Sequence, residues 1–256
     1  MSEAGERSGS VRLACLLFED DRLPDAEAVA ALASSTPTAP ARAPFHVTHR
    51  GDPGEGWVEL LRDGLTFDVE GLADGPHMAT GEAVAAVRTT YAIERSALAG
   101  TRAITLAPGP HLAGAERLLP VVRTAAAIAA LLARLPGVRA VAWLPAASAV
   151  PAGWFVELVE AWVGGGPFPA LALAAFDRDS AGALVSRGLE FVGSHDFRFA
   201  GRLGTSADDE AKAAIRLADW LVAHGRLDAP RDVELAGVGI VRLVPQPGLP
   251  LEARWM

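Results

Sequence analysis

The sequence predicts an α+β protein made of two ferredoxin-like halves of βαββαβ type, each an antiparallel sheet covered by helices. Short apolar runs alternate with segments of helical period, and Gly/Pro-rich stretches separate them. The order strand, helix, several strands, helix, strand occurs on both sides of a long central helix. The expected division is a disordered tail at 1–10, an N-terminal half at 11–115, the central helix at 116–136 and a C-terminal half at 137–256, in one compact body.

The N-terminal half opens with "VRLACLLF", an unbroken apolar run typical of a strand buried on both faces. Pro24 and Asp25 mark the start of the first helix, and the connector "TPTAPARAP" follows it. Asp63-Gly64 is a dipeptide typical of hairpins, and Gly100 ends a second helix. The strands predicted in this half occupy 11–18, 45–49, 57–64, 65–71 and 102–108, and the helices occupy 24–35 and 81–100.

The C-terminal half follows the apolar central helix "VVRTAAAIAALLARL". Pro151 opens one of its helices, and Gly164 to Gly166 close it. Ser206 is suited to cap the other helix, whose first turn carries three acidic residues and whose end is marked by Gly225. The strands predicted in this half occupy 138–145, 170–176, 182–192, 196–203 and 233–244, and the helices occupy 151–163 and 206–225.

Composition narrows the classes of function. The net charge of −8 and the scattered arginines argue against nucleic acid or an anionic membrane as partner, since both require clustered positive charge. The most apolar stretch is shorter than the ~20 residues that span a bilayer and contains two arginines, so we expect a buried helix. The polar start without an apolar segment, together with the single Cys15 in an apolar run, predicts a cytoplasmic protein with a buried thiol.

The segment "FVGSHDFRFAG" places Ser194, His195 and Asp196 side by side. A hydrolytic triad needs its three side chains in one hydrogen-bonded line, whereas neighbours in an extended chain point to opposite faces. The flanking runs alternate apolar and polar residues around Gly193-Ser194, which is typical of a two-residue hairpin loop. We therefore predict a hairpin with His195 exposed in the turn.

Two similar segments, "GPHMATGE" and "GPHLAGAE", place His77 and His111 before predicted helix starts. Such histidines could hold an anion or a metal, but two alone make a poor metal site, and Pro and Gly before a helix are common punctuation. No nucleotide-binding, metal-binding or nucleophile motif of known spacing occurs in the chain. The sequence thus predicts no catalytic residue, no metal site and no cofactor.

The C-terminal segment "VSRGLEFVGSHDFRFAG", followed by "AIRLADWLVAHG" and a last strand, resembles the bacterial family called domain of unknown function 4261. The segments "VRTAAAIAALLARLPGVRAVAWLPAASAV" and "LPDAEAVAALA" resemble the same family, so the likeness covers most of the chain. The resemblance implies a bacterial, intracellular protein. It implies no activity and no catalytic residue.

Two functions remain open. The first is a non-enzymatic protein-interaction or regulatory module, whose acidic surface suits a protein partner of opposite charge. The alternative is a small-molecule-binding protein or enzyme with its site in the cleft between the two halves, where ligands commonly bind. For that alternative the candidate residues are His77, His111, Arg187 and His195. The sequence does not determine the oligomeric state.

Overall fold

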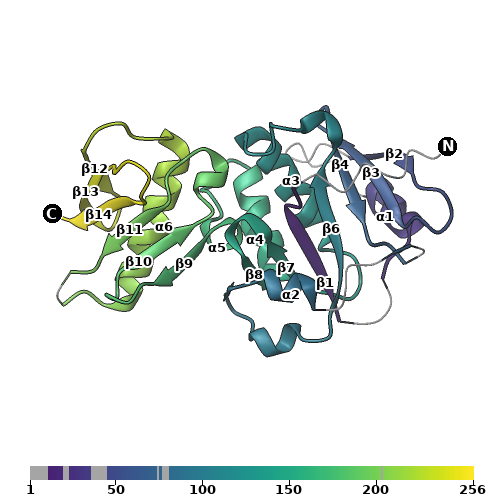
Figure 1. The fold of residues 1–256 in the computed structure, drawn as a ribbon, viewed down its shortest axis with the longest axis horizontal. Helices are drawn as coiled ribbons and strands as arrows, with labels where there is room; N and C mark the ends of the chain where they lie inside the picture. The colour runs from purple at the N-terminus through teal and green to yellow at the C-terminus, as the bar shows by residue number, and fades with distance from the viewer. Residues whose placement is uncertain (1–10, 20–22, 36–44, 74, 77–80, 203) are drawn as a thin grey trace.

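The computed structural model describes residues 11–19, 23–35, 45–73, 75–76, 81–202 and 204–256, and it is a mixed α+β structure with two sheets. The two sheets lie at opposite ends of an elongated molecule, with α4 (Ala152–Val163) and α5 (Ala170–Leu173) between them (Figure 1). The predicted tail at 1–10 and the predicted connector at 36–44 lie outside the described residues. No helix of the described part is both long and apolar enough for a membrane span.

The first sheet has eight strands in the order β2-β3-β4-β6-β1-β7-β8-β5. Neighbouring strands are antiparallel except β5 and β8, which are parallel. The strands are β1 (Ala14–Phe18), β2 (His46–Arg50), β3 (Trp57–Arg62), β4 (Leu65–Glu70), β5 (Thr89–Thr90), β6 (Arg102–Pro108), β7 (Val138–Trp143) and β8 (Ser148–Pro151).

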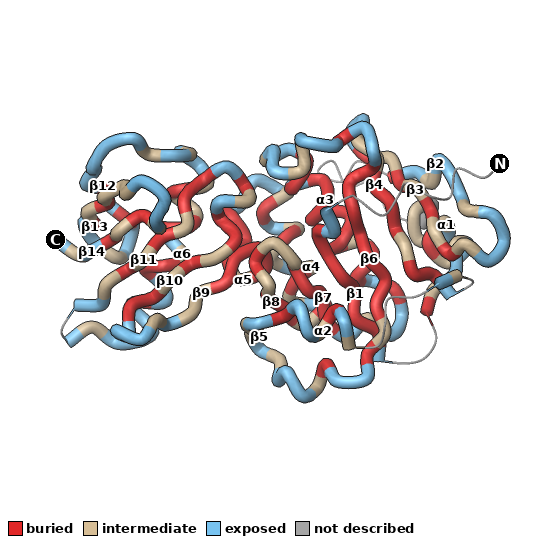
Figure 2. The backbone as a smooth tube through the Cα atoms, viewed as in Figure 1, coloured by how far each residue is buried: buried red, intermediate tan, exposed pale blue. Residues whose placement is uncertain are grey.

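Both faces of the first sheet are covered near its centre, which confirms the reading of its first strand. Leu16 on β1 joins the main core beneath α1 (Ala26–Ser35), α3 (Leu119–Leu132) and α4. Cys15 and Leu17 point to the opposite face, where α2 (Glu82–Ala86) and the 3₁₀ turn η2 (Arg95–Leu98) cover them. Figure 2 shows β1 buried along its whole length.

Local signals explain several elements of this region. Asp25 accepts a hydrogen bond from the Ala28 backbone at 2.7 Å and so caps α1. Asp63 and Gly64 both have positive φ (53° and 77°), as the predicted tight turn between β3 and β4 requires. The helix predicted over 81–100 is wrong. The observed helix α2 ends at Ala86. Beyond it, Arg88 and Thr89 donate backbone hydrogen bonds to Ala147, and β5 pairs with β8.

The second sheet has six strands in the order β12-β13-β14-β11-β10-β9, with β11 and β14 parallel. The helix α6 (Ala207–His224) covers one face, and Ser206 caps it by accepting the Asp209 backbone N–H, as predicted. The strands are β9 (Ala175–Arg178), β10 (Leu184–Arg187), β11 (Phe197–Ala200), β12 (Arg231–Leu235), β13 (Gly239–Val244) and β14 (Leu251–Trp255).

The division of strands between the halves differs from the prediction. β7 and β8 pair within the first sheet, and α4 packs on them, although all three were assigned to the C-terminal half at 137–256. The helix α3 connects β6 to β7 inside the first sheet and does not join two halves. The second region therefore reads three strands, a helix and three strands, which is not a βαββαβ unit. Apolar strands look alike in sequence, so element order alone cannot assign them to a sheet.

Smaller differences follow from turns that the apolar pattern hides. The predicted strand 170–176 begins as α5, and the predicted strand 233–244 is the hairpin β12–β13, with Gly237 and Gly239 at positive φ in its turn. The strands β8 and β14 were not predicted. Residues 144–145 and 190–192, expected in strands, lie in the 3₁₀ turns η4 (Leu144–Ala146) and η5 (Glu190–Val192).

Candidate functional site

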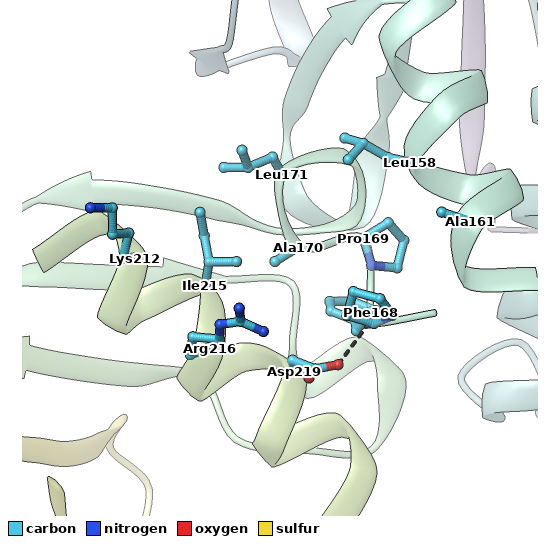
Figure 3. Close-up of a pocket in the computed structure, with 11 residues that line it drawn as sticks. Leu158, Ala161, Phe168, Pro169, Ala170, Leu171, Lys212, Ile215, Arg216 and Asp219 are labelled. Atoms are coloured by element: carbon cyan, nitrogen blue, oxygen red, sulfur yellow. Dashed lines mark hydrogen bonds between the residues drawn. The ribbon is translucent and has the colours of Figure 1, made fainter. Parts of the chain in front are cut away.

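A cleft of about 340 Å³ lies between α4, the segment around α5, and α6. It therefore lies between a helix of the first sheet region and the helix of the second (Figure 3). Most of its lining is apolar, and the charged residues come from α6. The residues that line it are Leu158, Ala161, Pro167, Phe168, Pro169, Ala170, Leu171, Lys212, Ile215, Arg216 and Asp219.

The floor of the cleft is fixed by Phe168. Its backbone N–H donates a hydrogen bond of 2.7 Å to Asp219 on α6, drawn in Figure 3. Its ring packs edge-on against Trp162 on α4, with 5.6 Å between the ring centroids. Phe168 is 4 % exposed, so the segment from Pro167 to Ala170 is held between the two helices. Contacts within the protein therefore fix the floor of the cleft without a bound ligand.

The α6 wall follows from helical spacing. Lys212, Ile215, Arg216 and Asp219 are separated by three, one and three residues, so they share one face of the helix. The opposite stripe of α6 is buried against the second sheet and includes Leu217. One amphipathic helix therefore gives this cleft an apolar residue, two cations and one carboxylate.

The two cations of the cleft, Lys212 and Arg216, differ in their interaction partners. Lys212 lies 3.6 Å from Asp209, and both side chains are largely exposed, so this ion pair contributes little. The Arg216 guanidinium has neither an ion pair nor a hydrogen bond to any residue that the structure describes. Figure 3 shows it turned toward the cleft, whereas the Lys212 ammonium points away. Arg216 is therefore the available charge at this site.

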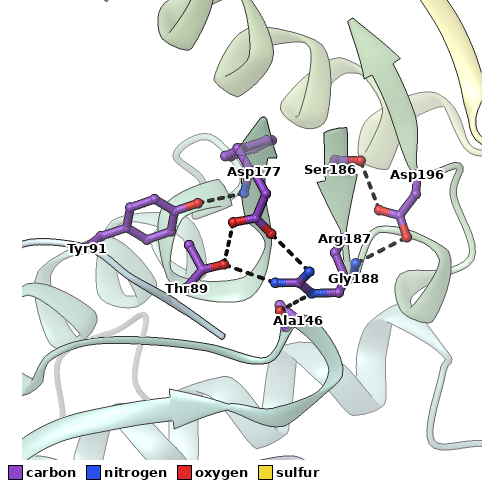
Figure 4. Close-up of polar contacts among 9 residues, drawn as sticks. Thr89, Tyr91, Ala146, Asp177, Ser186, Arg187, Gly188 and Asp196 are labelled. Carbon is purple, nitrogen blue, oxygen red and sulfur yellow. Dashed lines mark hydrogen bonds and ion pairs between the residues drawn. The ribbon is translucent and has the colours of Figure 1, made fainter. Parts of the chain in front are cut away.

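A second polar cluster joins the two sheet regions and contains the predicted candidate Arg187 (Figure 4). From β10, Arg187 donates to the carbonyl of Ala146 at 2.7 Å and to Thr89 at 3.0 Å, and it pairs with Asp177 at 2.9 Å. Thr89 also donates to Asp177 at 2.7 Å. All three groups of the guanidinium are thus occupied, and Arg187 ties β9 and β10 to the edge of the first sheet.

Two neighbours reinforce this junction. The hydroxyl of Tyr91 accepts a 2.6 Å hydrogen bond from the Phe176 backbone, and burial raises the pKa of Tyr91 to about 12. Gly188 has φ +102°, and a Cβ there would lie 2.9 Å from the Cβ of Ala146. Only glycine allows this approach without a shift of the chain. The geometry describes a structural joint, not a ligand site.

Ser194, His195 and Asp196 do not form a triad, as expected. Asp196 accepts hydrogen bonds from the Ser186 hydroxyl at 2.9 Å and from the Gly188 and Leu189 backbones at 3.2 and 3.0 Å. It therefore holds the loop between β10 and β11. That loop contains η5, so the predicted two-residue hairpin is wrong, although β10 and β11 do pair antiparallel.

The predicted exposure of His195 is also wrong. His195 is 7 % exposed, and its Nε2 lies 3.0 Å from the backbone nitrogen and 3.1 Å from the carbonyl oxygen of Leu227. The hydroxyl of Ser194 is fully buried, with no partner among the described residues. The segment that follows α6 folds over both residues, since Arg226 donates to the carbonyl of Ser194 at 3.2 Å. The sequence around Ser194 and His195 could not predict that the distant segment after α6 covers them.

The histidine pair is not brought into a described site. His111 is exposed in η3 (Pro110–Leu112) beside β4, with its Nδ1 3.1 Å from the Thr66 hydroxyl. His77 lies outside the described residues. The three described candidates, His111, Arg187 and His195, occupy separate environments and do not converge. No group of three His, Cys, Asp or Glu residues in the described part could hold a metal ion.

Two other titratable groups have clear structural roles. Burial raises the pKa of the Cys15 thiol to about 12, so it stays protonated between β1 and its covering helix α2. The pKa of Glu59 is lower than its usual value. Burial alone would raise it, but hydrogen bonds from Thr48 and His49 stabilise the carboxylate and outweigh the effect of burial. Neither group faces the cleft.

Comparisons with protein-family models, with curated proteins and with solved structures found no match for this chain. The local geometry is therefore the basis for a functional assignment. Sequence reasoning missed Arg216, Lys212 and Asp219 as site residues. Their shared face on the helix could have been read from spacing, but the opposing wall at 158–171 could not.

Proposed function

We propose that the protein binds a small, largely apolar ligand in the cleft between α4, α5 and α6. The observation that carries the proposal is the cleft itself: about 340 Å³, mostly apolar in lining, with a few polar groups on one wall. Small-molecule sites in proteins have volumes from ~300 Å³ upward and this same composition. They also occur preferentially between structural units, as this cleft does.

Binding without chemistry fits the polar groups better than catalysis does. Arg187 and Asp196 each hold backbone groups in place, and the buried His195 lies against the Leu227 backbone. Within the cleft, Asp219 accepts the Phe168 backbone N–H. These side chains support the walls and joints around the cleft. The proposal is therefore a ligand-binding or ligand-regulated protein of the cytoplasm, in line with the sequence resemblance to the bacterial family.

A protein-interaction module is the second candidate, and the uncovered face of the second sheet favours it. Ile240 on β13 is 51 % exposed, and Met256, whose backbone N–H donates to the Ile240 carbonyl at 3.0 Å, is 61 % exposed. Arg254 on the neighbouring strand has no ion pair among the described residues. Adjacent exposed apolar residues beside a free arginine are typical of contact surfaces.

We also infer a ferredoxin-like core for the first sheet. Its central strands lie in the order β4-β6-β1-β7, and α1 and α3 fall in the connections from β1 to β4 and from β6 to β7. This arrangement supports a split βαβ core with β2 and β3 added at one edge and β8 and β5 at the other. The second region follows another plan.

The cleft can be tested with N-phenyl-1-naphthylamine, a neutral dye that fluoresces in apolar surroundings. We expect saturable binding to the full chain, and at least tenfold weaker binding to A161F, because Ala161 lines the cleft and a phenyl ring would fill it. The matched control is A211F, an exposed alanine on α6 outside the lining. Absent saturable binding, or equal binding by A161F at an unchanged melting temperature, overturns the proposal.

A further inference from the structure

We propose that the ligand of the cleft is an apolar carboxylic acid whose carboxylate pairs with Arg216. The inference rests on the proposed function and names the class of ligand. The lining of the cleft is mostly apolar, and Arg216 is the charged residue of that lining without an ion pair or hydrogen bond to the described residues. A guanidinium presents a planar fork of donors that fits a carboxylate with two parallel hydrogen bonds.

The placement of Arg216 supports this pairing. It follows Ile215 directly on α6, and both residues line the cleft, so the charge lies at the border of an apolar wall. Figure 3 shows the guanidinium turned toward the cleft and away from the Lys212 ammonium. A ligand lying along the apolar wall would meet this guanidinium with its polar end.

The charge balance of the lining favours an anion. Lys212 and Arg216 are cations, and Asp219 is the one carboxylate among the lining residues. Asp219 accepts the Phe168 backbone N–H at 2.7 Å, so part of its charge is already satisfied by the protein. Lys212 is shared with Asp209, which leaves Arg216 as the principal partner. A cationic ligand would meet two like charges at the same wall.

The remaining walls define the body of the ligand. Leu158, Leu171 and Ile215 provide aliphatic surface, and Pro167 and Pro169 add flat, rigid surface. A volume of about 340 Å³ is at the small end for ligand sites, so it suits one or two rings or a short chain. Polar groups along the body would find few partners there. The class is therefore a compact apolar monocarboxylate.

The test uses two competitors of nearly the same shape, naphthalene-2-carboxylate and naphthalene-2-carboxamide, to displace N-phenyl-1-naphthylamine from the full-length protein. At low ionic strength we expect the carboxylate to compete about tenfold better than the amide, because the carboxylate can form two charge-assisted hydrogen bonds with the guanidinium and the neutral amide cannot. In R216Q the carboxylate should lose about tenfold, whereas the amide should lose less than threefold. R254Q, an exposed arginine outside the cleft, is the matched control and should keep the preference.

The outcomes separate the two proposals. If the dye binds and A161F blocks it, but carboxylate and amide compete equally, the ligand class is wrong and the binding function stands. A carboxylate preference that survives in R216Q also overturns the assignment to Arg216. If the dye does not bind in a saturable manner, the cleft is not a ligand site and both proposals fail. Loss of the preference in 0.5 M salt would agree with an ion pair at a solvent-accessible position.

Discussion

The two sheets solve the burial problem in different ways. In the first sheet, β1 and β6 lie at the centre and are buried almost throughout, with helices on one face and α2 and η2 on the other. In the second sheet, α6 covers one face, and the strands alternate buried and exposed residues. The uncovered face carries charge pairs such as Arg198 with Asp179 at 2.7 Å and Arg242 with Asp232 at 3.3 Å.

This difference shows where sequence information is concentrated. A strand buried on both faces must be apolar at every position, whereas a strand buried on one face needs only every second position. The first region is therefore constrained at almost every central residue, and the second is free to vary along one face. Surface residues that determine function can therefore vary more freely in the second region and at the junction, where the cleft lies.

The largest effect should come from Leu17, on the less obvious face of β1. Leu17 is fully buried and faces Ala103 and Ala140 on the neighbouring strands, which are too small to fill a cavity. We expect L17A to lower the free energy of unfolding by about 2–5 kcal/mol. The control I240A, on the open face of β13, should change it by less than about 0.5 kcal/mol. Urea denaturation of both variants measures the contrast, and equal effects would remove the distinction between the sheets.

The second effect concerns the joint between the sheets. R187A removes the group that binds the Ala146 carbonyl, Thr89 and Asp177, and we expect a loss of about 1–3 kcal/mol. The loss should appear as faster hydrogen exchange at β9, β10 and η4, with the centre of the first sheet protected as before. R254A, on the open face, is the matched arginine control. Uniformly faster exchange over both sheets would contradict a local joint.

Much of the fold was predictable because its local signals are strong. The turn at Asp63 and Gly64, the cap at Ser206 and the apolar run of β1 each depend on a few adjacent residues. The membership of β7 in the first sheet was not predictable, since its pairing with β1 joins residues more than a hundred positions apart. The helix predicted over 81–100 failed for the same reason, because the competing partner of β5 is the distant β8.

The candidate site was less accessible to sequence reasoning. Its walls come from 158–171 and 212–219, and the packing of the α5 segment against both α4 and α6 brings them together. Arg187 was chosen as a candidate but serves the joint, and His195 was expected in a turn but is buried. Arg216 carries no motif at all. It becomes notable only in the structure, where Lys212 pairs with Asp209 and Asp219 binds the Phe168 backbone, while Arg216 has no such partner among the described residues.

The third effect tests the loop between β10 and β11. In D196N the side chain keeps one oxygen and loses the acceptor for the Gly188 backbone N–H, so we expect a loss of about 1–2 kcal/mol. The control D232N breaks an exposed pair on the open face and should cost less than about 0.5 kcal/mol. Thermal unfolding at matched pH compares them. Comparable shifts would mean that Asp196 does not hold the loop.

The smallest expected effect is a pH dependence of the free energy of unfolding that arises in the region of the first sheet. Burial raises the pKa of Cys15 from 9.0 to about 12, and that of Tyr91 from 10.0 to about 12. When folding raises the pKa of such a group, the group stabilises the folded protein fully at pH values below its unfolded pKa. This stabilisation is lost as the pH rises toward the folded pKa. The Cys15 contribution therefore decreases mainly between pH 9 and 12, whereas that of Tyr91 decreases mainly between pH 10 and 12.

Between pH 9 and 10 the free energy of unfolding should fall by about 1 kcal/mol, close to the limit of ~1.4 kcal/mol per pH unit for one group. The variant C15A removes the thiol with a small loss of volume and should remove most of this slope, because Tyr91, whose unfolded pKa is 10.0, contributes the smaller part of it. Chemical denaturation of both proteins at pH 8, 9 and 10 measures the difference. An equal slope in C15A would show that the thiol is not shielded, and hence that α2 does not close the second face of the first sheet.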